Sequence, residues 1–104
     1  MATQTFFLKL LGPRPTFPMD MTASEKALML EHVAYMEKLF EAKKVIVYGP
    51  VMDSQGPYGM GVFVVEGEAE LRALMAEDPT IKAGMNTFEV SPMRVGRAQG
   101  MPAA

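Results

Sequence analysis

The sequence predicts a single α+β domain of ferredoxin-like type, with the element order βαββαβ. Four short runs of β-branched and aromatic residues are interleaved with two segments of helical periodicity. The short connection between the second run and the third contains a cluster of turn residues, which is typical of a hairpin. A chain of 104 residues has room for one hydrophobic core. We therefore expect a four-stranded antiparallel sheet with both helices packed on one face.

The first half of the chain predicts a strand, a loop and a long helix. Residues 5–11 are rich in strand formers, and the loop over residues 12–21 is rich in proline. Thr22 and Glu25 have the spacing of a capping box, in which the two side chains satisfy backbone N–H groups at the start of a helix. The helical pattern then covers residues 22–43.

The second half predicts the remaining elements and a tail. We expect Pro92 to stop the last strand, because proline cannot donate a hydrogen bond to a neighbouring strand. One domain should span residues 1–95, followed by a flexible tail over residues 96–104. The predicted elements are a strand over 45–48, a hairpin turn over 53–57, a strand over 60–66, a helix over 68–77, a helical turn over 79–83 and a strand over 86–91.

One face of this sheet has no helix to cover it. We expect it to carry apolar residues such as Phe7 or Phe63, and a second copy of the chain is the natural partner to cover them. The sequence thus predicts a homodimer.

The composition narrows the classes of function. The net charge is −2, and the ten Lys and Arg residues are spread among twelve acids, so we expect no nucleic-acid partner. The chain has no cysteine, which excludes disulfides and thiolate metal sites. Its eleven methionines predict an adaptable core, since no Met–His cluster suggests a metal site. We expect no metal, no cofactor and no membrane span, and a cytoplasmic location.

His32, the only histidine, is the first candidate for a functional residue. On a helical wheel it lies inside the apolar arc of the long helix, between Leu39 and Met36, and away from the charged face. A buried imidazole needs a hydrogen-bond partner. Two interpretations are open: a core histidine whose polar atoms are satisfied, or a general base that faces a pocket.

Asp53 is the candidate partner of His32. It follows the second strand, at the start of the hairpin turn, where a carboxylate could orient the imidazole. The alternative is that Asp53 hydrogen-bonds its own turn. Asp78, directly before Pro79, is interpreted as a helix terminator. The glycine-rich residues 56–61 favour a hairpin turn over a phosphate loop, because a strand rather than a helix follows them.

Four blocks of the sequence resemble the YciI-like (YCII-related) proteins. The resemblance extends over about residues 5–93 and rests on the order and spacing of these blocks. They are residues 31–35 (EHVAY), 49–53 (GPVMD), 59–61 (GMG) and 78–84 (DPTIKAG).

This resemblance implies a ferredoxin-like fold that pairs into a dimeric α/β barrel. It also implies an active-site pair, a helix histidine and an aspartate after the second strand, which fall on His32 and Asp53. A related family member is a dehydrochlorinase, and muconolactone isomerases share the barrel. The resemblance therefore suggests proton abstraction, elimination or isomerisation of a small cyclic substrate.

We consider three functions. In the first, His32 and Asp53 are catalytic, Tyr48 and Tyr58 shape the substrate pocket, and Arg14 balances the substrate's charge. The alternative is a non-catalytic small-ligand-binding or regulatory module that uses the same pocket. A third possibility is a cofactor-free oxygenase, which would need a deeper aromatic cavity than nine aromatic residues easily supply.

Overall fold

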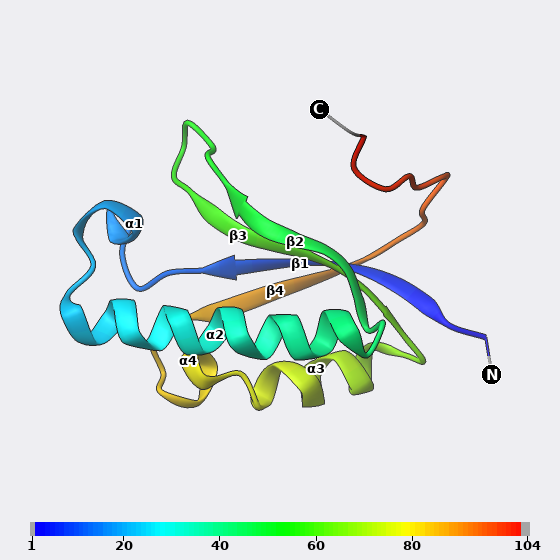
Figure 1. The fold of residues 1–104 in the computed structure, drawn as a ribbon, viewed down its shortest axis with the longest axis horizontal. Helices are drawn as coiled ribbons and strands as arrows, with labels where there is room; N and C mark the ends of the chain where they lie inside the picture. The colour runs from blue at the N-terminus through cyan, green and yellow to red at the C-terminus, as the bar shows by residue number, and fades with distance from the viewer. Residues whose placement is uncertain (1, 103–104) are drawn as a thin grey trace.

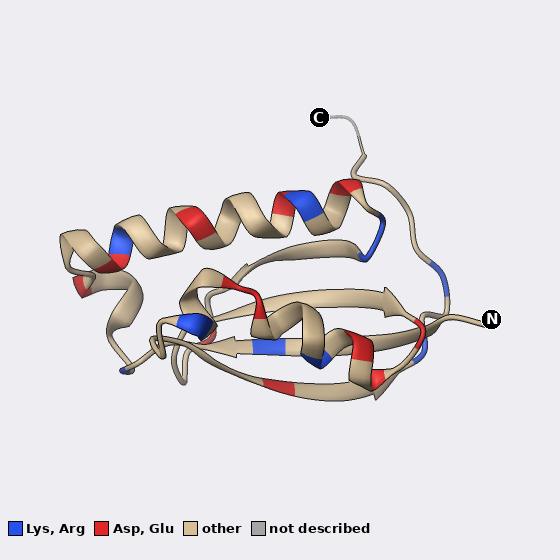
Figure 2. Ribbon diagram, turned by 90° about the horizontal axis from the view of Figure 1, so that it is seen from below, with Lys and Arg blue, Asp and Glu red and all other residues tan. Residues whose placement is uncertain are grey.

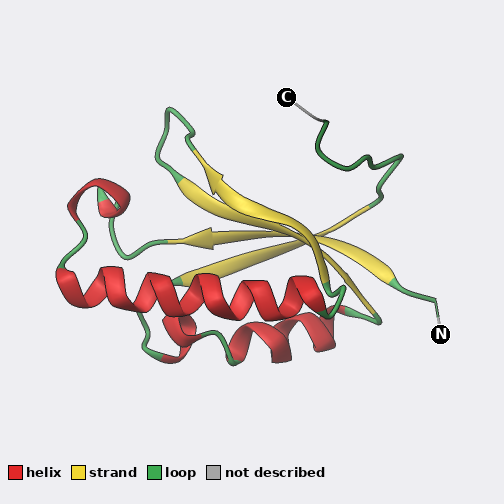
Figure 3. Cartoon of the chain, viewed as in Figure 1, coloured by secondary structure: helices red, strands yellow, loops and turns green. Residues whose placement is uncertain are grey.

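The structure, a computed structural model that describes residues 2–102, forms four strands and four helices in that range. In chain order they are β1 (Gln4–Leu11), α1 (Phe17–Asp20), α2 (Ala23–Glu41), β2 (Val45–Val51), β3 (Tyr58–Val65), α3 (Glu68–Ala76), α4 (Pro79–Lys82) and β4 (Thr87–Met93). Figure 3 shows how these helices and strands are distributed along the chain.

The strands form one antiparallel sheet in the order β2-β3-β1-β4. Helices α2, α3 and α4 lie on one face of this sheet, whereas α1 lies beyond the end of β1 (Figure 1). The α+β class and the βαββαβ order predicted from the sequence are thus confirmed. The tip of the β2–β3 hairpin, α1 and the start of α2 lie at the same end of the molecule (Figure 1).

The capping box fixes the start of α2 where the sequence predicted it. The backbone N–H of Glu25 donates to Thr22 Oγ1 over 3.2 Å, and the backbone N–H of Thr22 donates to Glu25 Oε1 over 2.8 Å. Both groups would otherwise lack a partner in the first turn of a helix. The helix ends at Glu41, and Lys43 then adopts a left-handed conformation (φ 62°) that turns the chain into β2.

The core lies between the sheet and the three helices. Alternate residues of β1, namely Phe6, Leu8 and Leu10, are buried on this face. The prediction that Phe63 lies on the uncovered face is wrong. It is opposite Phe6 in the register of β1 and β3 and is fully buried in the core. Phe7 points to the other face, as expected from the two-residue period of a strand.

Three elements differ from the prediction for identifiable reasons. α1 forms within the loop predicted to be irregular, with Pro18 in its first turn, where the missing N–H does no harm. β4 continues through Pro92 to Met93, and β2 continues through Pro50 to Val51. Both are edge strands, in which one side of the backbone needs no hydrogen-bond donor.

Residues 94–102 form neither helix nor strand, and they include most of the predicted tail. Residues 103 and 104 of that tail lie outside the described residues. Basic and acidic residues are interspersed on the helices (Figure 2). Among the described residues, no helix combines the length and apolarity needed to cross a membrane.

The capping box leads to a first prediction. Thr22→Ala should lower the free energy of unfolding by about 1 kcal/mol, since it leaves the Glu25 N–H without its partner. Urea denaturation at neutral pH measures this. Ser24→Ala is the control, because the Ser24 hydroxyl contacts only the Thr22 hydroxyl, at 3.2 Å, and its effect should stay within about 0.5 kcal/mol. Equal losses in both variants would contradict the assignment of Thr22 as the cap.

Candidate active site

A cavity of about 310 Å³ lies between the inner face of α2, the strands β1, β2 and β3, and α1. We call it the His32 cavity. Its walls are largely apolar, and methionines contribute much of them, so that the walls can adapt to the shape of a bound molecule. Six of the eleven methionines line it: Met21, Met29, Met36, Met52, Met60 and Met75.

His32 reaches this cavity from the middle of α2. Its side chain is 13% exposed, and its Nδ1 lies 2.6 Å from Oδ2 of Asp78 at the start of α4. A carboxylate accepts a hydrogen bond from the ring, so Nδ1 carries the proton. In the neutral imidazole, Nε2 is then the nitrogen with the free lone pair. It is the imidazole atom that can form a hydrogen bond with a molecule in the cavity.

Asp78 is fully buried and has two roles. Its Oδ1 accepts hydrogen bonds from the backbone N–H of Thr80 over 2.8 Å and from Thr80 Oγ1 over 2.7 Å, which caps α4. Its Oδ2 accepts the bond from His32. Burial acts to raise the pKa of this carboxyl group, but the bonds from His32 and Thr80 outweigh burial and lower the pKa below its usual value. Asp78 is therefore ionised at neutral pH.

The prediction that Asp53 orients His32 is wrong. Asp53 is exposed, and its Oδ1 accepts a hydrogen bond from the backbone N–H of Gln55 over 2.7 Å, so it stabilises its own turn. It lines a separate, open depression on the surface rather than the His32 cavity. The prediction that Asp78 acts as a helix terminator is wrong, because Asp78 is the N-cap of α4 and the partner of His32. An aspartate directly before a proline is a sequence signal for the start of a helix, and it could have indicated the first of these roles.

Tyr48 and Tyr58 both line the His32 cavity, and their predicted role in binding substrate stays a prediction. The Tyr48 hydroxyl donates a hydrogen bond to Glu37 of α2, and this bond, together with partial burial, raises the pKa of Tyr48. The Lys9 ammonium lies 4.5 Å from the centre of the Tyr58 ring, a cation–π contact that fixes the ring's position.

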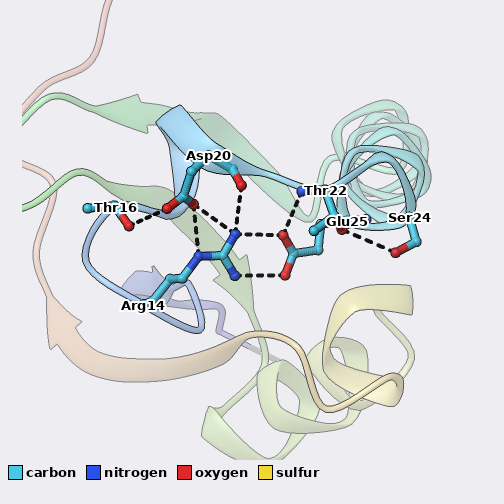
Figure 4. Close-up of polar contacts among 6 residues, drawn as sticks. All are labelled: Arg14, Thr16, Asp20, Thr22, Ser24 and Glu25. Atoms are coloured by element: carbon cyan, nitrogen blue, oxygen red, sulfur yellow. Dashed lines mark hydrogen bonds and ion pairs between the residues drawn. The ribbon is translucent and has the colours of Figure 1, made fainter.

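Arg14 lines the cavity too, but its charge is already balanced. Figure 4 shows its guanidinium between Asp20 of α1 and Glu25 of α2, an arrangement that we call the Arg14 latch. Four of its five N–H groups donate to these two residues over 2.8–2.9 Å. The latch fastens α1 to the start of α2. We therefore do not expect Arg14 to balance a substrate's charge.

α1 also depends on a close approach to the end of β1. A Cβ atom at Gly12 would lie 2.9 Å from a ring carbon of Phe17, so the buried Phe17 ring needs glycine at this position. Phe17 and Arg14 both line the His32 cavity.

The arrangement can accept a proton but offers no metal site. Among residues 2–102, no group of three His, Cys, Asp or Glu side chains is placed to hold a metal ion. Nε2 of His32, held at the wall of an apolar cavity, has the geometry of a general base.

The Arg14 latch leads to a prediction on pH. The hydrogen bonds from Arg14 lower the pKa of Glu25 from 4.5 to about 2, with help from the Thr22 N–H, and also lower the pKa of Asp20. A carboxyl group with a lowered folded-state pKa stabilises the fold above its unfolded pKa and loses this effect as the pH falls toward the folded value. The contribution of the latch should thus be constant above about pH 5 and disappear between pH 4.5 and 2.

The measurement is the difference in urea midpoint between wild type and Arg14→Gln as a function of pH. The difference should shrink as the pH falls through this range. Arg72→Gln, which breaks a pair between neighbouring turns of α3 on the surface, should show a small difference at every pH. A gap between wild type and Arg14→Gln that is the same at pH 7 and pH 2.5 would contradict the latch.

The chain is similar to two solved structures. The first is 5-chloro-2-hydroxyhydroquinone dehydrochlorinase (TftG) from Burkholderia phenoliruptrix AC1100, in complex with 2,5-dihydroxybenzoquinone. It shares 22% identity and a TM-score of 0.65, with 88% of this chain and 95% of that chain covered. The second is the NE2512 protein of unknown function from Nitrosomonas europaea, at 15% identity and a TM-score of 0.45, with 98% and 97% covered.

A search of functionally curated proteins found no relative. The likeness to TftG shows that the two chains share a fold. The model of the YCII-related domain matches residues 6–94, which is nearly the whole chain. The match includes the helix that carries His32 and the turn that carries Asp78, and the chain belongs to the family of proteins with a YCII-related domain.

Proposed function

We propose that this chain is a small-molecule enzyme in which His32 is the general base and Asp78 is its positioning residue. The observation that carries the proposal is the 2.6 Å contact between His32 Nδ1 and the buried Asp78 carboxylate at the wall of an apolar cavity. The contact holds the imidazole in one orientation and one tautomer. It leaves the Nε2 lone pair to accept a proton.

The proposed chemistry is proton abstraction followed by elimination or isomerisation. Nε2 takes a proton from an O–H or C–H group of the substrate, and the electron pair of that bond moves into the ring. In an elimination, a leaving group departs with its bonding electrons, and the proton later passes to solvent. In an isomerisation, the proton returns to another carbon. Neither reaction needs an oxidant or a reductant.

The substrate class is a small ring that carries hydroxyl groups. The neighbouring structure TftG is a dehydrochlorinase in complex with a dihydroxylated quinone, and we extend this ligand class to the present chain. The cavity supports it, since about 310 Å³ exceeds the roughly 150 Å³ that suffices for benzene in an engineered protein cavity.

Replacing Asp78 by Asn gives a sharp test. Asn Oδ1 can keep both bonds from Thr80, so that its NH₂ group faces His32 Nδ1. Because NH₂ is a donor, Nδ1 becomes an acceptor and the proton moves to Nε2. The variant should keep its fold, but Nε2 of His32, the atom that must accept the proton of the substrate, already carries a proton. We expect chloride release from 5-chloro-2-hydroxyhydroquinone to fall by about 100-fold or more, as in His32→Ala.

Selective ¹⁵N labelling of histidine reads the tautomer directly, since His32 is the only histidine. At pH 9 the spectrum should show the Nδ1–H tautomer in wild type and the Nε2–H tautomer in Asp78→Asn. The matched control is Asp53→Asn, which should change neither the tautomer nor the turnover. Full turnover in Asp78→Asn, or a loss in Asp53→Asn, would contradict the proposal. Binding with no turnover by wild type would favour the non-catalytic module.

We infer that the chain also forms a homodimer through the uncovered face of the sheet. Val62, Val64 and Phe7 lie on this face, opposite the core in the register of β1 and β3. Val47 of β2 is opposite Val62 and is 48% exposed. Apolar residues on an uncovered sheet face are typical of an interface between copies, and the dimeric α/β barrel that the family resemblance implies supports this choice of partner.

Val47→Lys should therefore yield a monomer without disturbing the core, because its side chain is half exposed in the single chain. Light scattering after size exclusion should give twice 11.4 kDa for wild type and 11.4 kDa for the variant. Leu30→Lys is the control, since Leu30 is 72% exposed on α2, on the helical side of the sheet. A monomeric wild type, or a dimer that survives Val47→Lys, would contradict the inferred interface.

A further inference from the structure

One polar side chain that lines the His32 cavity has, among residues 2–102, a buried atom without a hydrogen-bond partner. Asn86 is 3% exposed and lines the cavity, at the connection between α4 and β4. Among residues 2–102, its Oδ1 is the buried side-chain oxygen or nitrogen atom that lacks a hydrogen bond. Its Nδ2 contacts only Met29 Sδ, at 3.6 Å, and a thioether is a weak acceptor. Rotating the amide by 180° would leave the other end unpaired.

Asn86 is held beside the catalytic pair by its backbone. The N–H groups of Met85 and Asn86 both donate to the carbonyl of Thr80, at 3.0 and 3.1 Å. Thr80 in turn donates to Asp78, the partner of His32. The same turn of chain therefore positions the Asp78 carboxylate and the Asn86 amide.

The side chain of Asn86 also lies close to His32 across α2. Its contact residue Met29 precedes His32 by three positions, so the two residues are neighbours on one face of the helix, with Cβ atoms about 5–6 Å apart. Asn86 and His32 thus both line the cavity, and each lies next to Met29.

Two other polar residues of the cavity, Arg14 and Tyr48, are already engaged. The Arg14 guanidinium is taken up by Asp20 and Glu25, and the Tyr48 hydroxyl donates to Glu37. Apart from Arg14, no described residue of the lining carries a permanent charge. A cavity with apolar walls and an unused amide oxygen suits a neutral ligand with a hydroxyl donor, and it disfavours a carboxylate or phosphate.

We propose that Asn86 is a specificity-determining residue whose Oδ1 accepts a hydrogen bond from a hydroxyl group of a neutral, hydroxylated six-membered ring. A second hydroxyl group of the ring then faces Nε2 of His32, a contact that rests on the proposed function. The Asn86 contact itself does not need catalysis. An unpaired buried amide oxygen destabilises the empty protein, and a hydrogen bond from the ligand hydroxyl group removes this destabilisation on binding.

The test compares three probes of similar shape: hydroquinone, 4-methoxyphenol and 1,4-dimethoxybenzene. Calorimetry should show that wild type binds hydroquinone about tenfold or more tightly than 1,4-dimethoxybenzene, which has no hydroxyl donor. Asn86→Leu should reduce this preference to about twofold or less. Met29→Leu is the matched control, because it replaces the other member of the Asn86–Met29 contact and keeps the amide. Its preference should stay within about twofold of the wild-type value.

A measurement on wild type alone keeps the proposal falsifiable if Asn86→Leu does not fold. Asn86 is the only asparagine, so ¹⁵N-asparagine labelling gives one side-chain NH₂ signal. This signal should shift on addition of hydroquinone and stay in place with 1,4-dimethoxybenzene at equal occupancy. Equal affinity for the two probes, an unchanged preference in Asn86→Leu, or equal shifts with both probes would overturn the role of Asn86.

These results are separable from the fate of the proposed function. An Asn86-dependent preference without turnover supports the present inference and contradicts the enzyme. Turnover that depends on His32, with no preference for hydroxyl probes, supports the enzyme and contradicts the present inference. A preference for carboxylate probes such as benzoate over hydroquinone would overturn the choice of a neutral ligand.

Discussion

The buried Asp78 carboxylate is the constraint on which the site and much of its surroundings depend. A charge removed from water is tolerated only where hydrogen bonds satisfy it, and Asp78 receives three, two from Thr80 and one from His32. The bonds from Thr80 start α4, and the bond from His32 ties α4 to α2. Removal of any one donor would leave a buried carboxylate partly unsatisfied. The orientation of His32 is therefore a consequence of how the fold stabilises this charge.

A second hydrogen bond also links α2 to the segment of α3 and α4. The Tyr35 hydroxyl donates to the carbonyl of Leu74 at the end of α3 over 2.6 Å, and Tyr35 lies one helical turn beyond His32. Burial raises the pKa of Tyr35, and the nearby charges of Asp78 and Glu77 act in the same direction. α2 is thus attached to the α3–α4 segment at two successive turns, which gives the imidazole a rigid support. Rigid placement matters for the base that we propose, because proton transfer requires short and well-aligned contacts.

The sequence predicted the fold well because its signals are local. The capping box at Thr22, the hairpin between β2 and β3 and the two-residue alternation in β1 each act over a few residues. The errors arose where position in the sheet decides the outcome. Pro92 lies within a strand because β4 is an edge strand, and Phe63 lies in the core because of its register with Phe6. Neither property can be derived from the neighbouring residues alone.

The candidate site, too, could be predicted only where the sequence signal is local. The apolar helix face of His32 is a local signal that left two interpretations open, and the structure places His32 at the wall of a cavity. Its partner, Asp78, is 46 residues away in the sequence. Asp53 and Asp78 both lie in turn-forming segments, so the local pattern does not show which of the two reaches His32. Asp53 and Asp78 both stabilise backbone N–H groups two residues on. They differ in burial. Because Asp78 is buried, its second carboxylate oxygen needs a hydrogen-bond donor from the protein.

The way in which Asp78 holds His32 also limits the chemistry that fits the cavity. With Nδ1 engaged, the imidazole exchanges one proton at one atom and cannot supply a second proton elsewhere. The Tyr48 proton is donated to Glu37, and the Arg14 protons are donated to Asp20 and Glu25. His32, Tyr48 and Arg14 are thus poorly placed to protonate a leaving group as it departs. The arrangement favours a leaving group that is stable as an anion, or an isomerisation in which Nε2 returns the proton it took.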